Sequence, residues 1–188
     1  MRKSMKIILG LAVLLTAAAL TVNMSFDPAD AYTYDGETPG TLTAIGDAGS
    51  PNVFTFERWH FAEISMPDND PTQIKAVVDI DVTSAVCDWK ELESSVLAKK
   101  DYFFVKKFPK ATVTVDGATA QDDGSYLTEA ILNLKGVEGP VALTFTISDE
   151  APYEIEGSAL LMRRKFKFKG NGPKDEVPIA FSATLPLE

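Results

Sequence analysis

Few residues in this chain of 188 have side chains suited to covalent or metal chemistry. Cys87 and His60 are its only cysteine and its only histidine. Most zinc sites draw several ligands from these two residue types, and a single cysteine cannot form an intramolecular disulfide. The sequence has no glycine-rich phosphate loop and no nucleophile elbow. It therefore predicts a protein that is not an enzyme and that uses neither a metal nor a cofactor.

The basic residues are unevenly distributed in an acidic chain. The net charge is −9, which disfavours nucleic acid as a partner. Of the 18 basic residues, five lie between Lys99 and Lys110 and six lie between Arg163 and Lys174. If both stretches meet at one end of the fold, they form a cationic rim for an anionic lipid head group or a membrane surface. The alternative is two solvated faces that balance nearby acids.

Residues 1–31 are typical of an export signal. Basic residues at positions 2, 3 and 6 precede an uncharged run from Ile7 to Leu20, which is the arrangement of a secretory signal peptide. An uncleaved anchor is the alternative, because the stretch from Ile7 to Met24 is close in length to a membrane span. The segment predicts a periplasmic or secreted protein, or a membrane-anchored one if it is retained.

The rest of the chain has the period of β-structure. Residues 32–52 are rich in Gly, Pro, Thr, Ser and Asp and are predicted to be a linker or flexible arm before a domain at 53–188. Residues 88–100 repeat apolar positions every three to four residues and predict one short helix. Elsewhere the alternation of apolar and polar residues predicts half-buried strands, at residues 73–86, 111–115, 126–135, 141–147 and 177–185. Such a pattern indicates an all-β sandwich or a closed barrel.

The predicted inward faces are almost free of charge before residue 160, which makes them the candidate lining of a cavity. If they enclose space, burying ten methylene groups of a ligand would contribute about 8 kcal/mol before entropic losses. That is about the free energy of micromolar binding. The alternative is a filled core made by the same residues. The candidate lining residues are Val78, Ile80, Val82, Phe103, Val113, Val115, Leu132, Leu134, Leu143, Phe145, Phe166, Phe168, Ile179 and Phe181.

Two arginines are candidates for binding the head group of a ligand. Alternation along residues 160–169 places Arg164 with Leu160, Phe166 and other apolar residues, and Arg163 on the opposite, charged side. A charge among apolar neighbours needs a partner, and a lipid phosphate is one. A β-bulge that turns Arg164 outward is the alternative.

Three stretches, taken in order, resemble the YceI-like family of exported polyisoprenoid-binding proteins. The resemblance covers about residues 53–186 and departs from the family pattern at Phe104, at Glu138 and at Lys167, which replaces a glycine. The arginine of the family motif matches Arg163, so motif and alternation nominate different residues and both remain candidates. The stretches are residues 100–111 (KDYFFVKKFPKA), 134–141 (LKGVEGPV) and 163–168 (RRKFKF).

The resemblance implies a lipocalin-like antiparallel barrel of about eight strands that holds an isoprenoid or other long-chain lipid. A barrel of eight strands is about wide enough for one small ligand. The implied function is a cell-envelope protein that sequesters or carries this lipid and contacts a membrane surface transiently. The family's opening strands have no obvious counterpart between Tyr32 and Phe61. A non-catalytic β-sandwich interaction module with a filled core is the alternative function, and a homodimer stays open.

Overall fold

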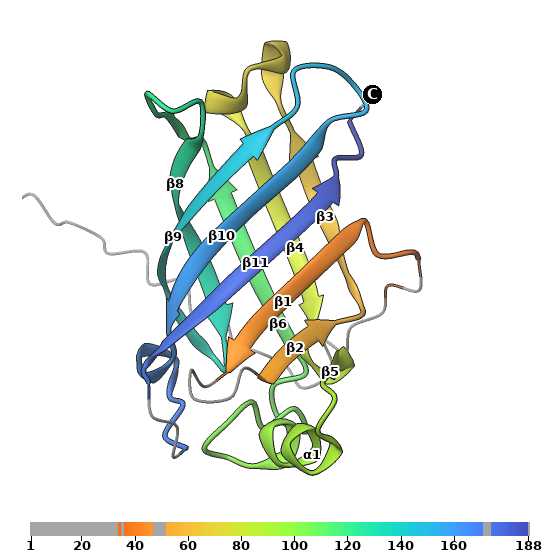
Figure 1. Ribbon diagram of the computed structural model, residues 1–188, viewed down its shortest axis with the longest axis vertical. Coiled ribbons are helices and arrows are strands. Elements are labelled where there is room, and N and C mark those ends of the chain that lie inside the picture. Colours follow the sequence, from red (N-terminus) through yellow and green to blue (C-terminus); the bar gives the residue numbers. More distant parts are fainter. Residues whose placement is uncertain (1–33, 35, 47–51, 171–173, 188) are drawn as a thin grey trace, which may run out of the picture.

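The computed structural model describes residues 34, 36–46, 52–170 and 174–187. These residues form one strongly curled antiparallel sheet with a single α-helix, α1 (Lys90–Ala98), at one end (Figure 1). Four short 3₁₀ turns are η1 (Pro67–Asn69), η2 (Pro71–Gln73), η3 (Val82–Ser84) and η4 (Arg163–Phe166). The strands are β1 (Gly40–Gly46), β2 (Asn52–Phe56), β3 (Trp59–Ser65), β4 (Lys75–Asp81), β5 (Ala85–Val86), β6 (Lys110–Asp116), β7 (Thr119–Ala120), β8 (Tyr126–Leu134), β9 (Val137–Ile147), β10 (Glu154–Met162) and β11 (Glu176–Thr184).

Bent strands join the two ends of the sheet. Neighbouring strands follow the order β3-β4-β6-β8-β9-β10-β11-β1-β2-β5, and the two-residue β7 pairs with β8. β2 runs into β3 through Glu57 and Arg58, and β4 runs into β5 through η3. Because β2 pairs with β1 while β3 pairs with β4, one bent strand connects both ends. Counting each bent strand once and setting β7 aside leaves eight strands in the described residues. The predicted lipocalin-like barrel with one helical connection is confirmed.

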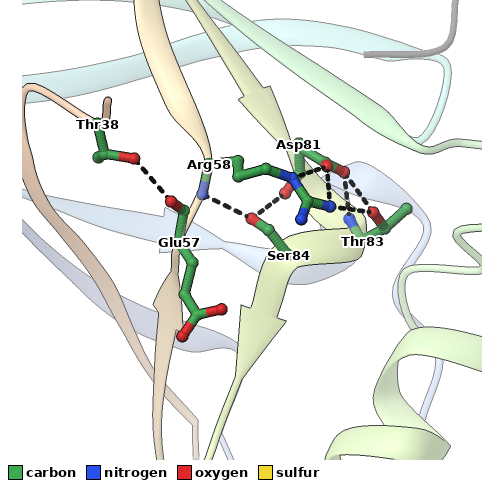
Figure 2. A network of polar contacts seen from close by, with 6 residues as sticks. All are labelled: Thr38, Glu57, Arg58, Asp81, Thr83 and Ser84. Carbon is green, nitrogen blue, oxygen red and sulfur yellow. Dashed lines mark hydrogen bonds and ion pairs between the residues drawn. The ribbon is translucent and has the colours of Figure 1, made fainter. Parts of the chain in front are cut away.

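A polar network stabilises this joint (Figure 2). Oδ2 of the buried Asp81 accepts a hydrogen bond from Nε of Arg58 at 2.8 Å. Its Oδ1 accepts from the main-chain nitrogen and the hydroxyl of Thr83 at 2.8 and 2.6 Å. An aspartate that binds the main chain two residues ahead forms a tight local turn. The chain therefore turns at η3, and the prediction of one strand over 73–86 was wrong.

Part of the predicted linker is a strand. β1 lies within residues 32–52 and pairs with β11 on one edge and with β2 on the other, so the linker prediction was wrong there. Gly40 allows a close approach, because a Cβ at this position would lie 1.9 Å from the main-chain oxygen of Ser182. β1, β2 and β3 are the opening strands that the sequence did not reveal between Tyr32 and Phe61.

The late strand ends earlier than its alternation predicts. β10 stops at Met162 and continues as η4, whose side chains do not follow a period of two. Leu160 is 50% exposed and Leu161 is 9% exposed. The prediction that Leu160 and Phe166 share an inward face was therefore wrong, because η4 changes the phase between them.

The predicted signal segment, residues 1–31, lies outside the described residues. None of the helices within the described ranges is long and apolar enough to cross a membrane.

Candidate functional site

The barrel contains a cavity of about 400 Å³ with an almost entirely apolar wall. Val78, Val113 and Ile179 face it and are only half-buried, as expected for side chains that border space instead of packing against another side chain. An apolar cavity of about 150 Å³ in another protein stays dry and binds benzene. The present volume therefore has room for a larger apolar molecule. The interior of the barrel is hollow, so the alternative of a filled core does not describe this structure.

Most of the predicted lining residues meet at this cavity, although their role in binding remains a prediction. Phe145 and Phe166 do not line it. Phe145 is buried in a stack with Tyr126, at 5.6 Å between ring centroids. Phe166 is buried in η4 beside Gly139. Both fill packed core next to the cavity. The predicted residues that line it are Val78, Ile80, Val82, Phe103, Val113, Val115, Leu132, Leu134, Leu143, Phe168, Ile179 and Phe181.

The sequence did not reveal an aromatic wall on β2 and β3. Phe54, Phe56, Trp59 and Phe61 all line the cavity, and so do residues of β1 and α1. Apolar residues at every second position, first at 54 and 56 and then at 59 and 61, were the available signal. The two-residue bend between β2 and β3 changes the phase of the alternation, so the two halves do not read as one strand.

The cavity opens at the end of the barrel where α1 lies, and Figure 1 shows this end at the bottom. Of the described residues that line it, Trp89 and Lys174 are the exposed ones, and Trp89 is 56% exposed. Lining residues at the other end, such as Ala76 and Ile155, are buried. The opening therefore lies at what we call the α1 end, which is formed by α1 and residues 99–109, 163–170 and 174–175.

The two basic stretches meet at the α1 end. The main-chain nitrogens of Lys169 and Gly170 donate hydrogen bonds to the main-chain oxygen of Asp101, at 2.9 and 3.0 Å. The side chains of Lys106 and Lys169, one from each stretch, are exposed. The two basic stretches therefore lie at one end of the fold, which is the arrangement that a cationic rim requires.

The two predicted head-group arginines occupy different positions. Arg163 is buried at the cavity wall. Its Nε and Nη1 donate to the main-chain oxygens of Lys174 and Gly170 at 2.8 and 2.9 Å, so it fastens the end of β10 to the residues around the mouth. Arg164 is exposed and does not line the cavity, and its main-chain nitrogen donates to Oδ1 of Asp175 at 2.8 Å. A head-group role for either arginine remains a prediction.

The single histidine and the single cysteine lie outside the cavity lining. His60 stacks on Tyr34, with ring centroids 3.9 Å apart. Burial lowers the pKa of His60, and the nearby Asp79 opposes this effect. Cys87 is buried, and its thiol donates to the main-chain oxygen of Trp89 at 3.2 Å. Within the described ranges, no group of three or more His, Cys, Asp or Glu residues could hold a metal ion.

A curled antiparallel barrel around an apolar cavity, open at one end, defines this protein as a lipocalin-like barrel. A family model described as the YceI-like domain matches residues 32–185, and the chain belongs to this family. The match begins before β1, which agrees with the corrected start of the barrel. No curated protein sequence matches the chain.

Solved structures share the fold at low sequence identity. BcnA of Burkholderia cenocepacia has a TM-score of 0.68 at 22% identity, over 76% of this chain and 94% of that one. A polyisoprenoid binding domain from Saccharophagus degradans, implicated in plant cell wall breakdown, has a TM-score of 0.58 at 16% identity, over 78% and 92%. The YCEI protein of Campylobacter jejuni has a TM-score of 0.59 at 20% identity, over 69% and 81%.

Proposed function

We propose that this protein binds a long-chain isoprenoid or similar lipid inside its barrel and carries or sequesters it in the cell envelope. The apolar cavity is the observation that carries this proposal. Each buried methylene group contributes about 0.8 kcal/mol, so a long chain overcomes the entropic cost of binding. Membership of the YceI-like family, and the polyisoprenoid binding domain among the similar structures, support a lipid as the ligand.

The chemistry of the wall favours binding over catalysis. No Asp, Glu, His or Cys is among the described residues that line the cavity. General acid–base catalysis needs such a group, or a Lys or Tyr with a suitable pKa, within hydrogen-bonding reach of the substrate. Apart from Asn52, whose amide is not a general acid or base, the polar lining residues are Tyr102, Arg163 and Lys174, which belong to the α1 end. They suit the recognition of a polar head, which makes a non-enzymatic carrier the better explanation.

The cationic rim is proposed as the surface that meets a membrane. Anionic lipids attract basic residues near the bilayer with about 1 kcal/mol each. Trp89 is exposed beside the mouth, and tryptophan favours the boundary between head groups and acyl chains. In this orientation the mouth faces the bilayer, and a lipid passes between bilayer and barrel with little exposure to water. Because residues 1–31 are predicted to be an export signal, we expect this exchange in the periplasm or after secretion.

Organic extraction of the purified protein, followed by lipid mass spectrometry, tests the proposal. We expect one class of long-chain lipid at close to one molecule per protein, enriched over the abundant phospholipids of the same cells. Repeated absence of any lipid, together with no uptake of an apolar fluorescent probe, would contradict it.

A further inference from the structure

One side chain in the cavity wall has a polar atom without a partner. Trp59 begins β3, lines the cavity and is 3% exposed. Its indole N–H is buried and makes no hydrogen bond. In the part of the chain that the structure describes, Oδ1 of Asn133 is the other buried side-chain atom in this condition, and Asn133 does not line the cavity. Trp59 thus combines an unused donor with a position at the ligand-binding space.

An unused buried donor is costly and uncommon. Buried tryptophan N–H groups usually have a hydrogen-bond partner, because burying such a group away from water without a partner destabilises the fold. Two neighbours of Trp59 on the wall, Ile80 and Phe61, have hydrocarbon side chains. Ile80 lies opposite it on β4, and the ring of Phe61 lies edge-on at 5.8 Å between centroids. An aromatic ring accepts a hydrogen bond only weakly.

We propose that Trp59 is a polar subsite of the cavity and donates a hydrogen bond to a neutral carbonyl-type oxygen of the bound lipid. This inference rests on the proposed function. The oxygen is neutral because an anion beside Ile80 and Phe61 would lose its hydration without a compensating charge. The oxygen reaches the covered nitrogen through a side-chain adjustment of the kind that commonly accompanies binding.

The position of Trp59 sets the orientation of the lipid. Trp59 lies opposite Ile80, which is next to the last residue of β4 and close to the α1 end. Ala76, at the start of the same strand, lines the cavity near its closed end. The four residue steps from Ala76 to Ile80 span about 13 Å. The carbonyl therefore lies near the mouth, and the hydrocarbon chain extends toward the closed end.

Nuclear magnetic resonance of the two indole N–H groups, from Trp59 and Trp89, tests the subsite directly. The purified protein is titrated with geranylgeranylacetone, an isoprenoid ketone, and with phytane, a hydrocarbon of similar length. We expect both to bind and the ketone alone to move the Trp59 indole proton downfield. A Trp89→Phe variant assigns the two signals. An unmoved Trp59 signal in the ketone complex would overturn the subsite.

The Trp59→Phe variant removes the donor and keeps an aromatic ring. Loss of one hydrogen bond predicts a ketone affinity about tenfold weaker, with phytane affinity unchanged. Leu127→Ala serves as the control and should leave the ketone affinity unchanged, because Leu127 is exposed on β8 and does not line the cavity. Equal losses for both ligands, or tighter binding of geranylgeranyl phosphate through the same indole, would overturn the proposal while leaving the carrier function standing. Failure of wild-type protein to bind any of the three would overturn the carrier function as well.

Discussion

The side-chain nitrogen of Lys135 donates a hydrogen bond to the main-chain oxygen of Lys100, 2.8 Å away. It donates a second hydrogen bond to the main-chain oxygen of Lys167 at 3.0 Å and lies 4.7 Å from the centre of the Phe168 ring. Lys135 is 4% exposed. One buried lysine in the turn between β8 and β9 therefore holds together the two basic stretches at the α1 end.

Replacing Lys135 with methionine should lower the free energy of unfolding by about 1–3 kcal/mol, because two main-chain oxygens lose their buried donor. Chemical denaturation measures the change. Lys75→Met is the matched control, because Lys75 pairs with Asp116 in an exposed ion pair at 2.8 Å and should lose at most about 1 kcal/mol. A loss for Lys135→Met no larger than that of the control would contradict the bridging role.

Lys135 should also give the wild type a distinct pH dependence. Burial lowers the pKa of Lys135 below its ordinary value of 10.5, and Asp101 partly opposes this. Between the lowered pKa and 10.5, the unfolded chain binds a proton that the folded chain does not, so stability rises with pH. Below this window both states are protonated and the contribution is constant. Denaturation across the alkaline range should show the wild type gaining stability relative to Lys135→Met. A constant difference would contradict this prediction.

The network in Figure 2 should contribute more stability than an exposed ion pair. Arg58→Met leaves the buried carboxylate of Asp81 with its hydrogen bonds from Thr83 but without a charge partner. We expect a loss of about 2–3 kcal/mol, below the full cost of isolating a buried charge, because the Thr83 bonds remain. Thermal or chemical unfolding measures it against Lys75→Met. Equal effects of the two substitutions would show that the joint does not depend on this pair.

Charge reversal on the cationic rim should slow lipid exchange with membranes. The double variant Lys106→Glu and Lys169→Glu replaces attraction to an anionic bilayer with repulsion. Transfer of a fluorescent lipid into vesicles containing phosphatidylglycerol should slow about tenfold or more at low salt and recover the wild-type rate at high salt. Lys75→Glu, on the strand end away from the mouth, should transfer at the wild-type rate. Equal slowing of both proteins would contradict docking through the α1 end.

Strands with regular alternation were predictable from the sequence. Residues 126–135 alternate cleanly, and β8 occupies nearly the same range with Thr128, Ala130 and Leu134 buried. The helix over 88–100 was equally clear. Such segments have one face in the barrel and one in solvent, so the local pattern carries the tertiary information.

Elements that depend on bends and turns were not predictable. β1 does not stand out, because its sequence GTLTAIG places Leu42, Ala44 and Ile45 among glycines and threonines without a strict alternation. Its pairing with β11 joins two segments that are far apart in the sequence, and a local pattern cannot show such a pairing.

The position of Trp59 in the cavity wall depends on the bend between β2 and β3, and the burial of Arg163 depends on η4. Lys167 ends η4 at a φ of 60°, a conformation that favours glycine, the residue found there in the family pattern. Because lysine stands at this position instead of glycine, the sequence carries no signal for the turn.

Native mass spectrometry of the purified protein tests the lipid-binding account most directly. Ala159 lines the cavity on β10, and Ala142 is exposed on β9, so Ala159→Phe fills the cavity and Ala142→Phe adds the same ring outside it. We expect the wild type and Ala142→Phe to carry the mass of one long-chain lipid, and folded Ala159→Phe to have lost it. Equal lipid occupancy in Ala159→Phe and the wild type, or no bound lipid in any of the three, would contradict the account.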